Sequence, residues 1–178
     1  MRPAPRRQRL RVGAPAVLAL GGNVGDRVAT LRAALDALAA HPGIRVERIS
    51  PLYETPALKP DGISGEAPAY LNAVVLIHTV LDPLALLAAV NRIEDGLGRV
   101  REERWGDRTV DIDIVDYSGI VSDDPRVTLP HPRAHERAFV LVPWRDIAPD
   151  AVLPSHGRVA DLAALATDPV TPFEETAP

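Results

Sequence analysis

The sequence contains no cysteine, so neither a disulfide framework nor a thiolate metal site is available to it, and the redox compartment is left open. Aromatic residues make up only 4% of the chain, whereas hydrophobic residues together make up 46%. The core must therefore be mostly aliphatic. No apolar run approaches the roughly 20 residues that a membrane-spanning helix needs. We expect a cytoplasmic protein without a membrane partner.

The chain also lacks an excess of positive charge, since 20 Lys and Arg residues stand against 24 Asp and Glu and the formal net charge is −4. Dedicated nucleic-acid binders usually carry a basic face and a clear excess of positive charge. The balance here weighs against a nucleic-acid partner, although it leaves room for a local basic pocket.

The 178 residues fit one domain of ordinary size. Residues 1–14 are rich in Arg and Pro, and no long apolar segment follows them, so we interpret them as a disordered basic tail and not as a signal peptide. We place a single domain at residues 15–165 and a C-terminal tail at residues 166–178.

Hydrophobic periodicity predicts an alternation of strands and helices. Short apolar or alternating runs indicate strands near residues 16–20, 44–55, 69–80 and 109–117. Helices are expected after Asp26 and after Asp82, two residues suited to capping a helix N-terminus. Shorter helical segments follow residue 129. The order β-α-β-β-α-β predicts an α+β, ferredoxin-like sandwich, with helices packed on one face of an antiparallel sheet and extra C-terminal elements.

The stretch RWGDRTVDIDI holds two acids, Asp111 and Asp113, in a run that alternates with aliphatic residues. On a strand the two carboxylates share one face and lie roughly 6–7 Å apart. Like charges this close favour a divalent cation, and Mg²⁺ commonly takes one or two carboxylates together with substrate phosphates. The alternative is a solvated strand face, on which acidic residues are ordinary.

Arginines cluster in the loop that precedes this strand: Arg99, Arg101, Arg104 and Arg108. The planar guanidinium matches phosphate oxygens in a bidentate manner. Paired acids with nearby arginines suit a polyphosphate bridged by magnesium. A loop neutralised by its own Glu102 and Glu103 is the alternative. Trp105 either stacks on a base or anchors the loop, and anchoring is favoured. The glycine-rich GGNVGD fits neither the phosphate-loop fingerprint nor the dinucleotide-binding fingerprint. We interpret it as a tight strand-to-helix turn.

Five blocks in one order resemble the 6-hydroxymethyl-7,8-dihydropterin pyrophosphokinase family of the folate pathway: LALGGNVGDR, SPLYETPAL, YLNAVV, NRIEDGLGRVREERWGDRTVDIDI and LPHPRAHERAFVLVPWRDIAP. The resemblance covers residues 16 to 150. It implies transfer of a pyrophosphoryl group from the co-substrate ATP to the hydroxymethyl group of the reduced pterin, with release of AMP. It also implies two Mg²⁺ ions, held by Asp111 and Asp113.

The resemblance assigns further roles residue by residue. The pterin pocket is matched by Thr55, Pro56, Leu58, Tyr70, Asn72 and Phe139. ATP contacts are matched by Asn91, Glu94, Arg101, Trp105, His131 and Arg137. Arg99 and Arg108 are expected to act catalytically together with Asp111 and Asp113. Without the resemblance, Tyr70 and Asn72 would be interpreted as a surface pair beside a core strand, and Phe139 as a core anchor.

Three positions depart from the family pattern. Gly22 stands where Ser is usual, Asp107 where Pro is usual, and Asn91 where Gln is common. Two other functions remain open at this point: an RNA-binding ferredoxin-like sheet, and a different magnesium-dependent enzyme such as a nucleotidyl transferase. The products separate the two enzymes, because a nucleotidyl transferase releases pyrophosphate and not AMP.

Overall fold

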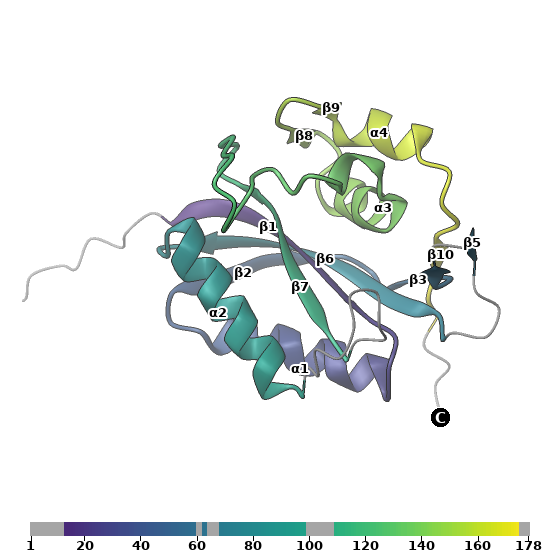
Figure 1. The fold of residues 1–178 in the computed structure, drawn as a ribbon, viewed down its shortest axis with the longest axis horizontal. Coiled ribbons are helices and arrows are strands. Elements are labelled where there is room, and N and C mark those ends of the chain that lie inside the picture. Colours follow the sequence, from purple (N-terminus) through teal and green to yellow (C-terminus); the bar gives the residue numbers. More distant parts are fainter. Residues whose placement is uncertain (1–12, 60–61, 64–67, 99–108, 175–178) are drawn as a thin grey trace, which may run out of the picture.

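The computed structural model describes residues 13–59, 62–63, 68–98 and 109–174. Its centre is a six-stranded sheet in which every pairing is antiparallel (Figure 1). The long strand β1 (Ala14–Gly22) lies between β6 (Tyr70–Thr79) and β7 (Asp111–Tyr117). The far edge of β6 pairs first with β2 (Ile44–Ile49) and then with β3 (Tyr53–Thr55). The order β7-β1-β6-β2, joined through two helices, confirms the ferredoxin-like prediction.

Two helices cover one face of the sheet, α1 (Arg27–Ala40) and α2 (Pro83–Gly96) (Figure 1). Each begins as the sequence predicts. The Asp26 carboxylate accepts a hydrogen bond from the Ala29 N–H at 3.0 Å, and Asp82 accepts one from the Ala85 N–H at 2.8 Å. Buried aliphatic residues of both helices pack on alternate residues of β1, β6 and β7, which forms the larger part of the core.

The opposite face carries the C-terminal elements. A 3₁₀ turn (Ala134–Glu136) leads into α3 (Ala138–Ile147), and α4 (Val159–Leu165) packs against α3 (Figure 1). Trp144 of α3 is buried against Val74 and Val115 in a second, smaller core cluster. Two further pairs of short strands lie outside the main sheet: β4 (Leu58–Lys59) with β5 (Gly62–Ile63), and β8 (Val152–Leu153) with β9 (Gly157–Arg158). The sheet therefore has a packed layer on each side.

The stretch 44–55, expected as one strand, forms two. Pro51 has no N–H to donate to a strand ladder, so regular pairing stops there. Ser50 compensates, because its N–H donates to the Val74 carbonyl and its Oγ accepts from the Val74 N–H, both at 2.9 Å. Within the described ranges, no helix has the length and apolar character that crossing a bilayer requires.

The chain also returns to the sheet near its C-terminal end. Strand β10 (Thr171–Pro172) pairs with the outer edge of β3. The Phe173 N–H donates to the Leu52 carbonyl at 2.9 Å, and the Phe173 ring packs against the larger core cluster. This return brings residues that are distant in sequence next to the end of β3.

Candidate active site

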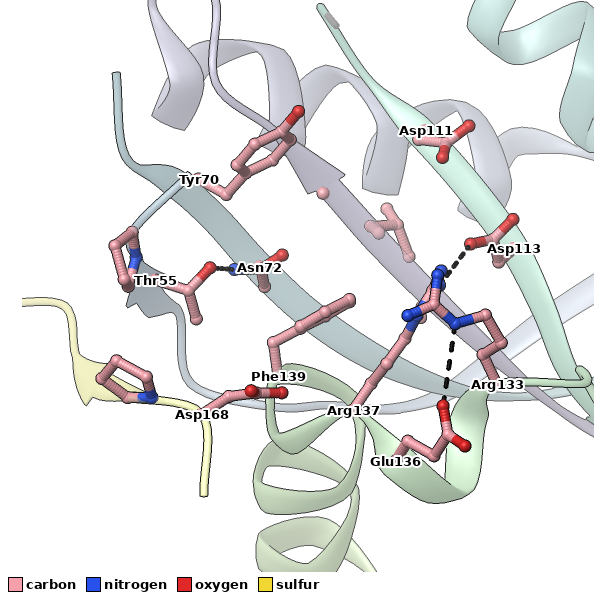
Figure 2. A pocket seen from close by; sticks show the side chains of 15 residues that line it. Thr55, Tyr70, Asn72, Asp111, Asp113, Arg133, Glu136, Arg137, Phe139 and Asp168 are labelled. Atoms are coloured by element: carbon pink, nitrogen blue, oxygen red, sulfur yellow. Dashed lines mark hydrogen bonds and ion pairs between the residues drawn. The ribbon is translucent and has the colours of Figure 1, made fainter. Parts of the chain in front are cut away.

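A pocket of about 460 Å³ opens on the face of the sheet that carries α3 (Figure 2). Its lining comes from the ends of β1, β3, β6 and β7, from the segment that begins α3, and from Asp168 and Pro169 of the C-terminal return. Because α3 covers only part of this face, the strand ends remain accessible to a ligand of small-molecule size.

The floor of the pocket is set by the register of three strands. Gly21 of β1 lies opposite Asn72 of β6 on one side and opposite Asp111 of β7 on the other. Ala19, two residues before Gly21 on the same face of β1, lies opposite Asp113 of β7. Since neighbouring strands lie about 4.8 Å apart, Asn72 and Asp111 are separated by roughly 10 Å across a row that contains only small side chains. The alternation of Ala19 and Gly21 therefore leaves space for a ligand between the amide and the acids.

Asn72 is held firmly at one side of this space. Its side chain is only 4% exposed, and its Nδ2 donates to Thr55 Oγ1 at 3.0 Å and to the Tyr53 carbonyl at 3.5 Å. A Cβ atom on Gly21 would lie 2.9 Å from Asn72 Oδ1, so only glycine fits at this position without displacing the amide. With both donor contacts committed, Asn72 offers its Oδ1 as an acceptor.

Two aromatic rings reach the pocket from different elements. Tyr70 projects from the start of β6, and Phe139 projects from the first turn of α3 (Figure 2). The guanidinium carbon of Arg137 lies 5.4 Å from the centroid of the Phe139 ring, which holds both side chains in place. Aromatic rings from both sides are well suited to a flat heterocycle.

The paired acids behave as the alternation in β7 predicts. Ile112 and Ile114 are 3% and 6% exposed in the larger core, whereas Asp111 and Asp113 point to the opposite face and line the pocket. Positive groups approach Asp113 from the segment before α3. Arg137 Nη1 and His131 Nε2 each lie 3.8 Å from its Oδ2 (Figure 2 shows the arginine contact). The acids and cations expected from the sequence thus meet at one end of the pocket.

His131 is oriented by the backbone. Its Nδ1 accepts a hydrogen bond from the Arg133 N–H at 3.2 Å, so the neutral ring carries its proton on Nε2, the atom that faces Asp113. Burial lowers the pKa of His131 and the Arg137 charge lowers it further, while the Asp113 charge opposes both. The favoured form is a neutral imidazole that presents an N–H donor toward the acids.

A second pocket, of about 280 Å³, lies on the outer side of β7. Leu87, Asn91 and Glu94 of α2 line it, together with the loop that runs from Arg126 to Pro132. Asp111 and Asp113 line this pocket as well as the first. The two acids therefore stand where the two pockets meet.

Glu94 supports the strand that carries the acids. It is 1% exposed, and its Oε1 accepts a hydrogen bond from the Ile112 N–H at 2.6 Å. Ile112 lies between the two acids, on the edge of β7 that does not pair with β1. Glu94 thus fixes the position of Asp111 and Asp113 from the helix behind them.

The turn between β1 and α1 is tied to the strands that shape the first pocket. The buried Asn23 donates from Nδ2 to the Pro68 carbonyl at 3.3 Å. Arg27 Nη1 donates to the Ala69 carbonyl at 2.7 Å and lies 2.8 Å from Glu54 Oε2. GGNVGD is therefore a structural turn, as predicted, but its polar residues also hold the start of β6 and the end of β3 in position.

Tyr53 links β3, which carries Thr55, to α3, which carries Phe139. Its hydroxyl donates to Asp146 Oδ2. Burial, and to a smaller extent this hydrogen bond, raises the pKa of Tyr53 to about 12 from an ordinary value of 10.0. An unfolded chain loses this proton at lower pH than the folded protein does. Stability that depends on the neutral phenol is therefore present below pH 10 and lost as the pH rises through about 12.

We expect Tyr53→Phe to flatten the fall in unfolding free energy between pH 10 and about 12. Near neutral pH the variant should be less stable by about 1 kcal/mol, the usual value for one hydrogen bond. Urea unfolding monitored by circular dichroism over this pH range tests both points. An unchanged alkaline slope in the variant would show that another group controls the transition. Tyr117→Phe, measured alongside, gives the contribution of a second tyrosine away from the pocket, because burial also raises the pKa of Tyr117 and its hydroxyl donates to the Leu81 carbonyl at 2.8 Å.

A magnesium ion fits the chemistry of this site. The described residues contain no group of three or more His, Asp or Glu side chains able to enclose a metal ion. Two carboxylates on one face, open to two pockets, suit an ion that keeps most of its coordination for water and phosphate oxygens. The donors are all oxygen atoms, which magnesium prefers.

The structure brings together nearly all of the predicted site residues that it describes. Thr55, Pro56, Tyr70, Asn72, Phe139 and Arg137 line the first pocket, and Asn91, Glu94 and His131 line the second. Leu58 lies in β4, and its side chain is not among those described. Arg99, Arg101, Trp105 and Arg108, like Arg104 and Asp107, lie outside the described residues.

Several lining residues were missed from the sequence. Arg133 and Glu136 lie in the same block, LPHPRAHERAFVLVPWRDIAP, as His131 and Arg137, and the Arg133 Nε lies 3.7 Å from Glu136 Oε2. Because they lie beside His131 and Arg137 in the sequence, Arg133 and Glu136 could have been predicted as site residues. Asp168 and Pro169 carried no signal, because only the C-terminal return brings them to the pocket.

Fold and site together define an α+β enzyme domain in which paired carboxylates and cationic side chains stand between two small-molecule pockets. The sequence profile of the 7,8-dihydro-6-hydroxymethylpterin-pyrophosphokinase (HPPK) family matches residues 17–149. The chain belongs to this family. It is an enzyme of folate biosynthesis that transfers pyrophosphate from ATP to 6-hydroxymethyl-7,8-dihydropterin.

Two curated relatives are similar in sequence to this chain over most of their own length. The 2-amino-4-hydroxy-6-hydroxymethyldihydropteridine pyrophosphokinase of Methylorubrum extorquens is 50% identical over 138 residues, which cover 78% of this chain and 85% of the relative. The protein of the same name from Haemophilus influenzae is 41% identical over 147 residues, covering 83% of this chain and 89% of the relative.

A solved structure supports the fold. The wild-type HPPK-DHPS of Plasmodium falciparum superposes with a TM-score of 0.66 at 15% identity, covering 89% of this chain. This chain spans only 42% of that longer protein. At this identity the likeness concerns the fold alone.

Proposed function

We propose that the larger pocket binds the dihydropterin, that the smaller pocket binds ATP, and that Asp111 and Asp113 hold Mg²⁺ where the pockets meet. The observation that carries this proposal is that both acids line both pockets. A transfer reaction needs its two substrates in contact at one point, and the acids mark the only region that the two pockets share among the described residues.

The larger pocket suits the pterin because of its shape and its polar groups. Tyr70 and Phe139 stack on the flat ring, while Asn72 Oδ1 and the Thr55 hydroxyl hydrogen-bond its edge. The open row at Ala19 and Gly21 lets the hydroxymethyl group extend toward Asp111 and Asp113. The reacting oxygen then lies beside the phosphates.

The smaller pocket suits ATP because an apolar wall lies close to polar and cationic groups. Leu87, Ile114 and Val127 contact the base, and Asn91 and Thr128 supply hydrogen bonds. His131 and Arg137 then lie along the phosphates. For Arg101 and Trp105 we keep the ATP contacts that the resemblance implies, and for Arg99 and Arg108 the catalytic role.

The reaction is an in-line attack of the pterin hydroxymethyl oxygen on the β-phosphorus of ATP, with AMP as the leaving group. When bound, Mg²⁺ neutralises charge on the triphosphate and orients the reacting groups. The neutral His131 donates from Nε2 to a phosphate oxygen, and Arg137 stabilises the negative charge that develops during transfer. The aromatic walls exclude water and so limit hydrolysis.

The pocket assignment is tested by two alanine variants, each of which is the control for the other. Asn72→Ala is expected to raise the KM for the dihydropterin by about 10- to 100-fold, because a buried hydrogen-bonding group is lost, and to leave the KM for ATP unchanged. Asn91→Ala should raise the KM for ATP by about tenfold and leave the pterin KM unchanged. Release of AMP, followed by chromatography, is the readout. The opposite pattern, with Asn72→Ala affecting ATP, would contradict the assignment.

A further inference from the structure

We propose that Asp168, in the C-terminal return, determines pterin specificity by accepting hydrogen bonds from the 2-amino and N3–H groups of the pterin. This inference rests on the assignment of the larger pocket to the pterin. It adds to the site a residue that lies outside the segment matched by the family profile, residues 17–149.

The position of Asp168 is set by the residues that follow it, which pair with the edge strand β3. After α4 the chain crosses toward β3, where Thr171 pairs with Glu54 and Pro172 pairs with Tyr53. The Thr171 hydroxyl donates to the Glu54 carbonyl at 3.3 Å. Farther along, Phe173 packs on the core, and the guanidinium carbon of Arg27 lies 5.8 Å from its ring. Asp168 and Pro169 are thereby held in the pocket wall near the end of β3.

The strand order places Asp168 at the end of the pocket opposite the acids. Strands follow one another as β10-β3-β6-β1-β7, so Asp111 and Asp113 lie on the last strand and the C-terminal return lies beside the first. Figure 2 shows the same arrangement, with Asp168 on one side of Phe139 and Asp113 on the other. The hydroxymethyl group of the pterin must face the acids, where transfer occurs. The pyrimidine edge of the ring then faces Asp168 and Thr55.

That edge of the pterin requires acceptors. It presents the 2-amino group and the N3–H as neighbouring donors, a pattern that a carboxylate accepts in a bidentate manner. Asn72 and Thr55 do not meet this need alone. Asn72 has one acceptor oxygen, and Thr55 Oγ1, which already accepts from Asn72 Nδ2, retains its own hydrogen for donation. Asp168 supplies a second pair of acceptor atoms on the same wall of the pocket.

Asp168 has such atoms available. Its side chain is half-buried in the pocket wall, and among the described residues its carboxylate makes no hydrogen bond or ion pair. Because no described residue engages this carboxylate, a ligand that donates two hydrogen bonds to it can form both without displacing a protein contact. A pterin therefore gains more from this position than a ring that lacks the 2-amino group.

The test compares 6-hydroxymethyl-7,8-dihydropterin with its 2-desamino analogue, in the wild type and in Asp168→Ala, with AMP release as the readout. The wild type should favour the amino compound in kcat/KM by about tenfold, the discrimination expected of a charge-assisted hydrogen bond. Asp168→Ala should raise the pterin KM by a similar factor, leave the ATP KM unchanged and lose the discrimination. Asp168→Asn, which keeps one acceptor oxygen, should fall between the two.

Asp161→Asn, which removes an exposed carboxylate from α4, is the matched control and should behave as the wild type does. Equal discrimination in the wild type and in Asp168→Ala overturns the proposal. Asn72→Ala, measured alongside, separates the two ways to fail. If it raises the pterin KM while Asp168→Ala does not, Asp168 has no such role although the pocket binds pterin. If neither variant affects the pterin KM, the pocket assignment fails as well.

Discussion

Replacing Asp111 and Asp113 together by asparagine is expected to lower kcat by at least ~10³-fold, since metal-ion stabilisation of the transferring phosphoryl group is worth several kcal/mol. Asparagine keeps the size and the polar character of each side chain but removes the charge that, in the proposed site, attracts Mg²⁺. Asp111 and Asp113 line both pockets, so their neutralisation affects the reacting centre and neither distant end. Single-turnover release of AMP at saturating substrates isolates the chemical step.

The control for this variant is Asp116→Asn, which changes an acid of the same strand that lines neither described pocket. It should keep wild-type kcat. The double variant should remain folded, with an unfolding free energy within about 1 kcal/mol of the wild type, because the ion pairs it loses are partly exposed. A double variant that retains more than a tenth of the wild-type kcat would show that the acids do not bind the catalytic metal.

Glu94→Ala is the second variant with a large expected effect. Its removal leaves the Ile112 N–H without its buried partner, and the unfolding free energy should fall by about 3 kcal/mol, the upper range for losing a hydrogen bond to a charged group. Because Ile112 lies between the two acids, kcat should fall in the same variant. Urea unfolding and steady-state kinetics measure the two effects.

Glu94→Gln distinguishes the hydrogen bond to Ile112 from the charge of Glu94. Glutamine retains an acceptor oxygen for the Ile112 N–H, so it should restore most of the stability that alanine loses. A glutamine variant as unstable as the alanine variant would show that the charge of Glu94, and not the hydrogen bond to Ile112, stabilises the fold.

The parts of the fold that could be predicted are those that local rules control. Asp26 and Asp82 cap their helices because a short acidic side chain reaches the free N–H groups of the first turn. The alternation in β7 is decisive in the same way. Ile112 and Ile114 must be buried, so Asp111 and Asp113 must face the other side. The break at Pro51 was missed, because alternation on both sides of the proline suggested one continuous strand.

The candidate site could be predicted only in part, for a different reason. The pocket-lining residues that lie within the five sequence blocks could be predicted, because the resemblance assigns them a role position by position. The pairing of Gly21 with both Asn72 and Asp111 depends on strand register, which the sequence does not state. The contribution of Asp168 depends on a chain segment that crosses the sheet edge after α4. Contacts of this kind join residues far apart in sequence, and no local pattern marks them.

The measurement that tests the central claim most directly is magnetic resonance with Mn²⁺ in place of Mg²⁺, on the enzyme with a bound pterin and a non-hydrolysable ATP analogue. Paramagnetic relaxation reports which nuclei lie near the metal ion. If Asp111 and Asp113 hold the metal between the two pockets, the signals of the nucleotide phosphorus atoms and of the pterin hydroxymethyl protons should both be strongly broadened. Both effects should be absent from the double asparagine variant. Broadening of the phosphorus signals alone, or equal broadening in the variant, would contradict the claim that these two acids place the metal at the junction of the pockets.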